Sequence, residues 1–167
     1  LMLSNEFLQN KDGIVYMEGL HRPRQNYDAD GRGSLKDIQI SVLIDEGTAS
    51  SSEIFAGAIQ DNDRGVIVGR RSFGKGLVQE PINFTDGSGV RVTVARFYTP
   101  SGRCIQKPYD KNNYQYDIYE RYAHGEMTSA DSMKVDTTAL FYTVKGRRVY
   151  GGGGIIPDIF VPIDTTL

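Results

Sequence analysis

Residues 41–79 read SVLIDEGTASSSEIFAGAIQDNDRGVIVGRRSFGKGLVQ, and the order of elements in this stretch decides the fold. The apolar, β-branched run at residues 38–44 predicts a buried strand. A turn of small residues follows, and the apolar side chains of residues 53–62 then recur with the helical period. Residues 65–69 (GVIVG) predict a second buried strand. Strand, helix and strand in this order predict a parallel α/β unit.

The segment before this unit is mixed in character. Residues 1–10 have the spacing of the end of a helix, and residues 13–18 (GIVYME) predict a short strand. Residues 21–37 (HRPRQNYDADGRGSLKD) are polar and rich in turn formers, so they predict a surface loop.

The segment after the unit is richer in β structure. Residues 82–98 (INFTDGSGVRVTVARFY) place a turn cluster at 86–89 between β-rich segments, which predicts a hairpin. Residues 107–136 are a polar, tyrosine-rich insertion with a helical candidate at 114–122, and we interpret them as a solvated surface excursion. The closing VYGGGGIIPDIFVPI predicts a strand, a glycine turn and a final extended segment.

Composition argues against several functions. The 167 residues are 39% hydrophobic and 24% charged with a formal net charge of −2, which is typical of one globular domain. This balance gives no sign of a nucleic-acid or anionic-membrane partner. Cys104 is the only cysteine, which excludes an intrachain disulfide. Two histidines, His21 and His124, leave little material for a Ser-His-Asp triad or a metal motif such as HExxH.

Ser50 lies where the small-residue turn enters the predicted helix. Helix N-termini carry unpaired backbone N–H groups and partial positive charge. A nucleophile at this place sets a developing oxyanion beside ready donors. The tetrapeptide Ser50-x-x-Glu53 is also a capping box, which needs no catalysis to explain it. Both interpretations stay open on these residues alone.

Lys75 lies in GRRSFGKG, residues 69–76, which is one residue short of a phosphate-binding P-loop. Gly76 stands where such a loop needs Ser or Thr, and the next residues are β-like rather than helical, so we reject nucleotide binding. Ser72-x-x-Lys75 matches the SxxK pattern of acyl-transferases. That pattern belongs on a helix, and Gly74 and Gly76 disfavour one.

A lysine acts as a general base only if its neutral form is accessible near neutral pH. The reference pKa of about 10.4 must then fall by several units, each worth ~1.4 kcal/mol. Burial lowers the pKa of a lysine, and the neighbouring glycines predict a backbone packed closely enough to bury Lys75. A surface lysine is the competing interpretation.

Residues 40–106 resemble the carboxy-terminal processing peptidases, also called tail-specific proteases. GTASSSEI, AGAIQD, VGRRSFGKGLVQ, RFYTPSGRCIQ and the closing YGGGGIIPDI match in the right order. The resemblance implies an α/β fold with a partial ClpP/crotonase-like protease core, a β-hairpin and the tyrosine-rich insertion at about 107–136. It implies that residues 1–167 are the C-terminal part of one peptidase domain. A PDZ domain and an upstream glycine-rich oxyanion loop are then absent from this chain.

The resemblance also implies roles for single residues. Ser50 is the nucleophile, Lys75 is the general base 25 positions later, and Gln79 supports the lysine. The backbone N–H of Ser51 is one oxyanion donor. Contact between Gln79 and Lys75 needs a bend, because four residues of extended chain span ~13 Å. Asp61 is often aligned as a third catalytic residue, but it lies roughly 16 Å along the helix from Ser50. We therefore interpret Asp61 as a structural helix-end residue.

The implied function is a serine-type endopeptidase that cleaves near the C-termini of protein substrates through an acyl-enzyme, without metal or organic cofactor. Protein tails are the implied partners, the bacterial periplasm or membrane surface is the implied location, and a homo-oligomer is compatible with the resemblance. Residues 1–167 alone are expected to have little activity, because losing one oxyanion donor costs ~10²–10³ in turnover. The alternatives are a non-catalytic binding or scaffolding module on this fold and a crotonase-type acyl-CoA enzyme.

Overall fold

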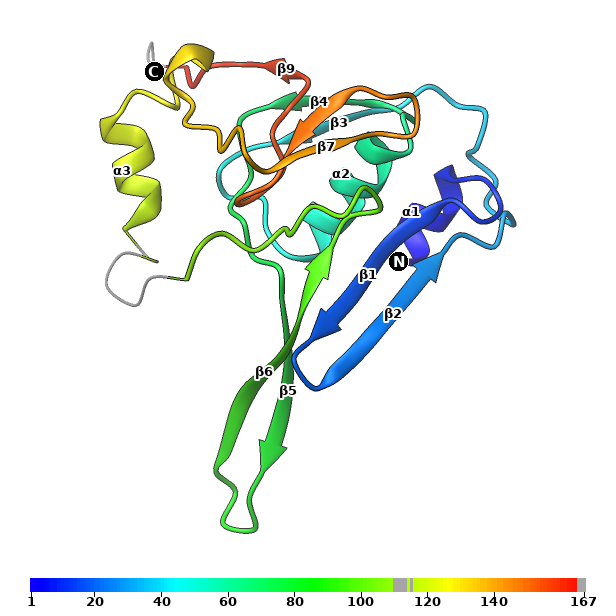
Figure 1. Ribbon diagram of the computed structural model, residues 1–167, viewed down its shortest axis with the longest axis vertical. Coiled ribbons are helices and arrows are strands. Elements are labelled where there is room, and N and C mark those ends of the chain that lie inside the picture. Colours follow the sequence, from blue (N-terminus) through cyan, green and yellow to red (C-terminus); the bar gives the residue numbers. More distant parts are fainter. Residues whose placement is uncertain (110–113, 115, 165–167) are drawn as a thin grey trace.

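The computed structural model describes residues 1–109, 114 and 116–164 (Figure 1). In chain order the elements are α1 (Met2–Phe7), β1 (Gly13–Gly19), β2 (Arg22–Asp28), β3 (Ser41–Ile44), α2 (Ser51–Asp61), β4 (Val66–Gly69), β5 (Leu77–Asn83), β6 (Gly89–Tyr98), α3 (Asp117–Ala123), the 3₁₀ helix η1 (Ala130–Ser132), β7 (Leu140–Tyr142), β8 (Arg148–Tyr150) and β9 (Ile159–Phe160). None of the described helices is long and apolar enough to cross a membrane.

The predicted parallel α/β unit is confirmed. β3 and β4 pair in parallel from Ser41 opposite Val66 onward, and β9 adds in parallel on the other side of β4. α2 is the crossover helix between β3 and β4. Its buried face carries Ile59, which belongs to the same apolar cluster as Ile44 of β3 and Ile67 of β4. This cluster packs α2 against the parallel strands.

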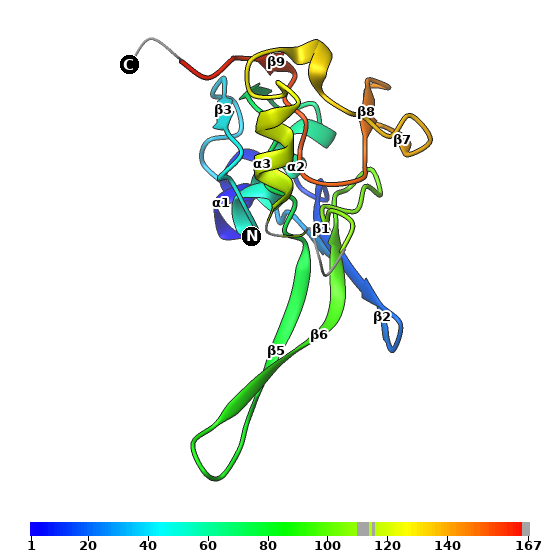
Figure 2. The same ribbon diagram turned by 90° about the vertical axis from the view of Figure 1, so that its left-hand side faces the viewer.

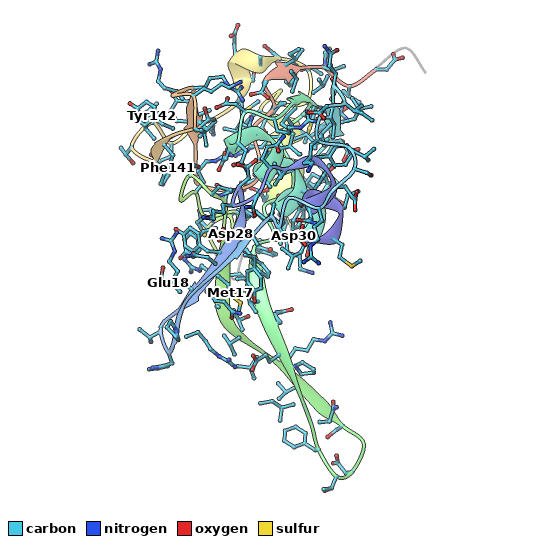
Figure 3. All side chains as sticks on the ribbon, turned by 90° about the vertical axis from the view of Figure 1, so that its right-hand side faces the viewer. Met17, Glu18, Asp28, Asp30, Phe141 and Tyr142 are labelled. Atoms are coloured by element: carbon cyan, nitrogen blue, oxygen red, sulfur yellow. The ribbon has the colours of Figure 1, made fainter. Side chains whose placement is uncertain are left out.

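An antiparallel sheet in the order β2-β1-β6-β5 forms the second layer. The predicted strand at residues 13–18 is confirmed as β1, and the predicted hairpin is confirmed as β5 and β6. The far end of this hairpin projects from the body as an arm (Figure 1). Its side chains stand apart from the packed ones (Figure 3), and Ile82 and Phe84 near the tip are 49% and 53% exposed.

The prediction of a loop at residues 21–37 was wrong for its first part. Residues 22–28 form β2, which pairs antiparallel with β1 at the edge of the sheet. An edge strand needs only backbone pairing on one side, so a polar and exposed sequence is compatible with it. Pro23 is compatible for the same reason, because an edge position tolerates a missing N–H.

The prediction of a buried strand at residues 38–44 was wrong in its start and in most of its burial. The strand begins only at Ser41, and the side chain of Leu43 is 78% exposed while Ile44 is buried. Alternate residues of a strand point to opposite faces. Ile44 faces α2, whereas Leu43 points to the other face of the sheet.

The insertion is not a solvated excursion, which corrects that interpretation. α3 overlaps the helical candidate predicted at 114–122 and ends one residue beyond it, and part of the candidate falls outside the described residues. Arg121, Glu126 and Met127 are all buried. α3 stands to one side of the parallel unit in Figure 1 and in front of it in Figure 2, and Arg121 connects it to the carbonyls of Arg71 and Ser72. Polar composition concealed this packing because its buried groups are largely charged side chains paired with each other and with backbone carbonyls.

Candidate active site

Ser50 is the N-cap of α2, and its backbone adopts φ 59° and ψ −119°. This left-handed conformation favours glycine, and a non-glycine residue there costs of order 1–3 kcal/mol. The residue is exposed. Ser51 follows as the first residue of α2, one of the positions whose N–H has no partner within a helix. The exposed Ser50 therefore lies next to the N–H of Ser51 and the positive end of the helix.

The carboxylate of Glu53 connects this turn to the segment that carries Lys75. It is fully buried. Oε2 accepts the backbone N–H of Ser50 at 2.9 Å and that of Lys75 at 2.8 Å. Oε1 accepts the N–H of Gly74 at 2.6 Å and the hydroxyl of Ser72 at 2.5 Å. One side chain thus binds both the N-terminus of α2 and three residues of a distant segment, Ser72, Gly74 and Lys75.

The shared oxygen sets the spacing between Ser50 and Lys75. The two backbone nitrogens lie no further apart than 5.7 Å, the sum of their distances to Oε2. Each nitrogen is ~1.46 Å from its own Cα, so the two Cα atoms lie within about 9 Å. This spacing allows a hydroxyl and an amine to meet at ~3 Å.

Lys75 is exposed, so the expected burial is wrong for this chain. Gly74 and Gly76 on either side of it are buried, as predicted, and a Cβ on Gly76 would lie 2.7 Å from the backbone nitrogen of Gln106. The two glycines turn inward against Gln106 and Gly154, and this turns Lys75 outward.

Ser72 is buried, and its hydroxyl accepts the N–H of Ile155 at 2.6 Å while donating to Glu53. It lies on a segment without helix or strand. The SxxK interpretation needs a reactive serine on a helix. In the structure Ser72 has a structural role instead, because its hydroxyl bonds to Glu53 and Ile155.

Gln79 and Asp61 make hydrogen bonds to other parts of the chain. Gln79 is on β5, with its amide nitrogen 3.5 Å from the hydroxyl of Thr93. No hydrogen bond joins Gln79 to Lys75 in the part of the chain that the structure describes, and its role stays a prediction. Asp61 is the last residue of α2 and is buried. It pairs with Arg103 and accepts the N–H of Ser101 at 2.9 Å, which confirms it as a helix-end structural residue.

Sequence reasoning missed the wider part that Glu53 plays. The capping box with Ser50 is present. The other donors lie 19, 21 and 22 positions downstream. No periodicity reveals such contacts, because two of the three donors are backbone groups. A glutamate at the third position of a helix otherwise lined by small and apolar residues was the available signal.

Comparisons with known proteins identify the family and the fold. The model of the family described as "Peptidase family S41" matches residues 1–118. The C-terminal processing peptidase, chloroplastic, of Tetradesmus obliquus is 51% identical over 100 residues, which cover 60% of this chain and 22% of that protein. The carboxyl-terminal-processing protease of Synechocystis sp. (strain ATCC 27184 / PCC 6803 / Kazusa) is 44% identical over 94 residues, covering 56% of this chain and 22% of that protein.

Among solved structures, a photosystem II D1 C-terminal processing protease matches with a TM-score of 0.64 and 29% identity. The match covers 96% of this chain and 30% of that one. The chain spans about a fifth of the length of the Tetradesmus obliquus and Synechocystis relatives.

Proposed function

This chain belongs to peptidase family S41, and we propose that it carries the nucleophile and the general base of a serine endopeptidase that cleaves near the C-termini of protein substrates. Ser50 is the nucleophile and Lys75 is the base. The observation that carries the proposal is the shared Glu53 oxygen, which holds the backbones of both residues together. The left-handed conformation of Ser50 supports it, because strain of this kind gathers at functional sites.

In the proposed reaction, the neutral amine of Lys75 takes the proton of the Ser50 hydroxyl as Oγ bonds to the scissile carbonyl carbon. The backbone N–H of Ser51 stabilises the oxyanion. The tetrahedral intermediate expels the amine of the leaving peptide, which receives the proton from Lys75. Water then hydrolyses the acyl-enzyme with Lys75 again as the base, releasing the new C-terminus and restoring Ser50.

The exposed state of Lys75 requires a further step in this proposal. A neutral amine at neutral pH needs a lowered pKa, and burial is the means available. The chain covers 30% of the structure it resembles. We therefore propose that substrate and the rest of the protein cover Lys75, and that Gln79 then orients its amine.

The substrate class, the location in the cell and the oligomeric state are also proposals. Protein tails suit the names of the relatives, several of which are called C-terminal processing peptidases or proteases. These relatives come from chloroplasts as well as bacteria. A location in the bacterial envelope is therefore a separate proposal from the protease function. A homo-oligomer remains compatible with it.

The test is a serine scan in the full-length protein, assayed on an unstructured protein substrate and by labelling with a serine-reactive phosphonate. Ser50→Ala is expected to abolish cleavage and labelling. Ser51→Ala and Ser52→Ala are matched controls that should keep most activity. They leave the backbone N–H groups intact, and their side chains point ~100° and ~200° around the helix from Ser50.

Lys75→Met should remove cleavage as Ser50→Ala does, with the fold retained by circular dichroism. An equal loss from Ser52→Ala in a folded variant would reassign the nucleophile. A wild-type protein that neither cleaves nor is labelled would favour the non-catalytic binding module instead.

A further inference from the structure

The segment that carries Lys75 lies between two sets of partners. Residues 70–76, here called the base segment, form neither helix nor strand. No regular ladder therefore fixes their position. Glu53 accepts the N–H groups of Gly74 and Lys75 on one side. The carbonyl groups of the base segment must find donors elsewhere.

The insertion supplies three of these donors, while the N–H of Phe97 in β6 donates to the carbonyl of Gly76 at 2.7 Å. The guanidinium of Arg121, on α3, donates from Nη2 to the carbonyl of Arg71 at 2.6 Å and from Nη1 to the carbonyl of Ser72 at 3.1 Å. The backbone N–H of Lys107 donates to the carbonyl of Gly74 at 3.0 Å. Three carbonyls leading to Lys75 are therefore held from the insertion.

Arg121 is itself fixed on all sides. Its side chain is 5% exposed, and its Nε donates to Oε1 of Glu126 at 2.9 Å. Glu126 also receives Arg71 of the base segment through two bonds, at 2.8 Å and 2.7 Å. Burial, and then the neighbouring Arg71, hold the pKa of Arg121 below its ordinary value. A buried ionic cluster of this kind is weak evidence for stability, and setting a specific geometry is a role such clusters can have.

The start of α3 is tied to the same place. Asp117, its first residue, pairs with Nζ of Lys107 at 2.9 Å. That ammonium also lies 4.0 Å above the ring centre of Phe73 in the base segment. α3 therefore contacts the base segment directly through Arg121, and its first turn is linked to the base segment indirectly through Lys107.

We infer that Arg121 is a positioning residue, which holds the base segment from its carbonyl side so that Lys75 stays opposite Ser50. The inference rests on the proposed function of Lys75. The family match ends at residue 118, so Arg121 and Glu126 lie beyond it. The insertion is then a part of this chain that fixes the geometry of a site whose own residues lie within the matched region.

The experiment compares three variants of the full-length protein. Arg121→Met removes the donors and keeps an extended apolar side chain, and Arg121→Lys keeps the charge. Glu120→Ala is the matched control, because Glu120 is exposed on the same helix. Steady-state cleavage gives kcat and KM, and hydrogen exchange reports the amides of Gly74 and Lys75.

We expect Arg121→Met to lower kcat at least ~10-fold with KM within about twofold, because small displacements of a reacting group cost 10- to 100-fold. Exchange at Gly74 and Lys75 should quicken at least ~10-fold while the amides of α2 and β4 keep their protection. Arg121→Lys should restore only part of kcat, because one ammonium lacks the planar fork that reaches two carbonyls and a carboxylate. Glu120→Ala should match the wild type.

Wild-type kcat and exchange in folded Arg121→Met would overturn the inference. Faster exchange spread evenly over the whole chain would also overturn it, because that is a global loss of stability. If the wild type shows neither cleavage nor serine labelling, the proposed function fails by itself. The exchange of Gly74 and Lys75 then still decides whether Arg121 holds the base segment.

Discussion

Glu53→Gln is the substitution that tests the geometry of the site most directly. The buried carboxylate accepts four hydrogen bonds. Glutamine keeps one acceptor oxygen. Its NH₂ group replaces the other oxygen and must face the two donors that this oxygen accepted. If the oxygen stays with Ser72 and Gly74, the N–H groups of Ser50 and Lys75 lose their shared acceptor.

The expected magnitude follows from those two donors. A buried donor left without a partner costs ~1–3 kcal/mol. Both hydrogen bonds are part-buried, so water relieves some of this cost. We expect the free energy of unfolding to fall by ~2–4 kcal/mol, which is large for a change of one atom. Activity should fall by at least ~10-fold in the variant that remains folded, because the Ser50–Lys75 spacing loosens.

The assay is urea unfolding of the full-length protein followed by circular dichroism, with kcat/KM measured on the same preparations. Glu18→Gln makes the same chemical change at an exposed position of β1 and should be neutral. A free energy of unfolding for Glu53→Gln within ~0.5 kcal/mol of the wild type would refute the reasoning, because surface substitutions already vary by that much.

Two further predictions concern single residues. Ser50→Gly should be ~1 kcal/mol more stable than Ser50→Ala in urea unfolding, because glycine adopts a φ of 59° without steric cost; equal midpoints would show that the turn is unstrained. Burial raises the pKa of Asp63, but hydrogen bonds from Arg147, Thr143 and Lys145 outweigh burial and hold it below its ordinary value of 3.8. A lowered carboxyl pKa stabilises the fold above the unfolded value and loses that effect as the pH falls through the folded value. The stability difference between wild type and Asp63→Asn should therefore be largest at neutral pH, begin to shrink below pH ~4 and be lost once the pH is below the folded pKa, and a difference that grows on acidification would contradict this sign.

The sequence by itself determined the elements whose signal is local. The apolar runs at β3 and β4 with a helical period between them predicted the parallel unit, and the turn cluster at 86–89 predicted the hairpin. The place of Ser50 at the head of α2 was equally readable, because small residues and a capping glutamate mark a helix start. Each of these features depends on residues within a few positions of one another.

Only the tertiary structure decided how the site is held together. Glu53 reaches Lys75 across 22 positions, and Arg121 reaches Ser72 across 49. In both cases the partner is a backbone N–H or carbonyl. Every residue has a backbone carbonyl, and every residue except proline has a backbone N–H. A group common to all residues leaves no mark in a sequence. The polar strand β2 was visible only in the folded chain for the same reason, because backbone pairing with β1 holds it. The buried face of α3 was likewise visible only there, because Arg121 bonds to backbone carbonyls of a distant segment.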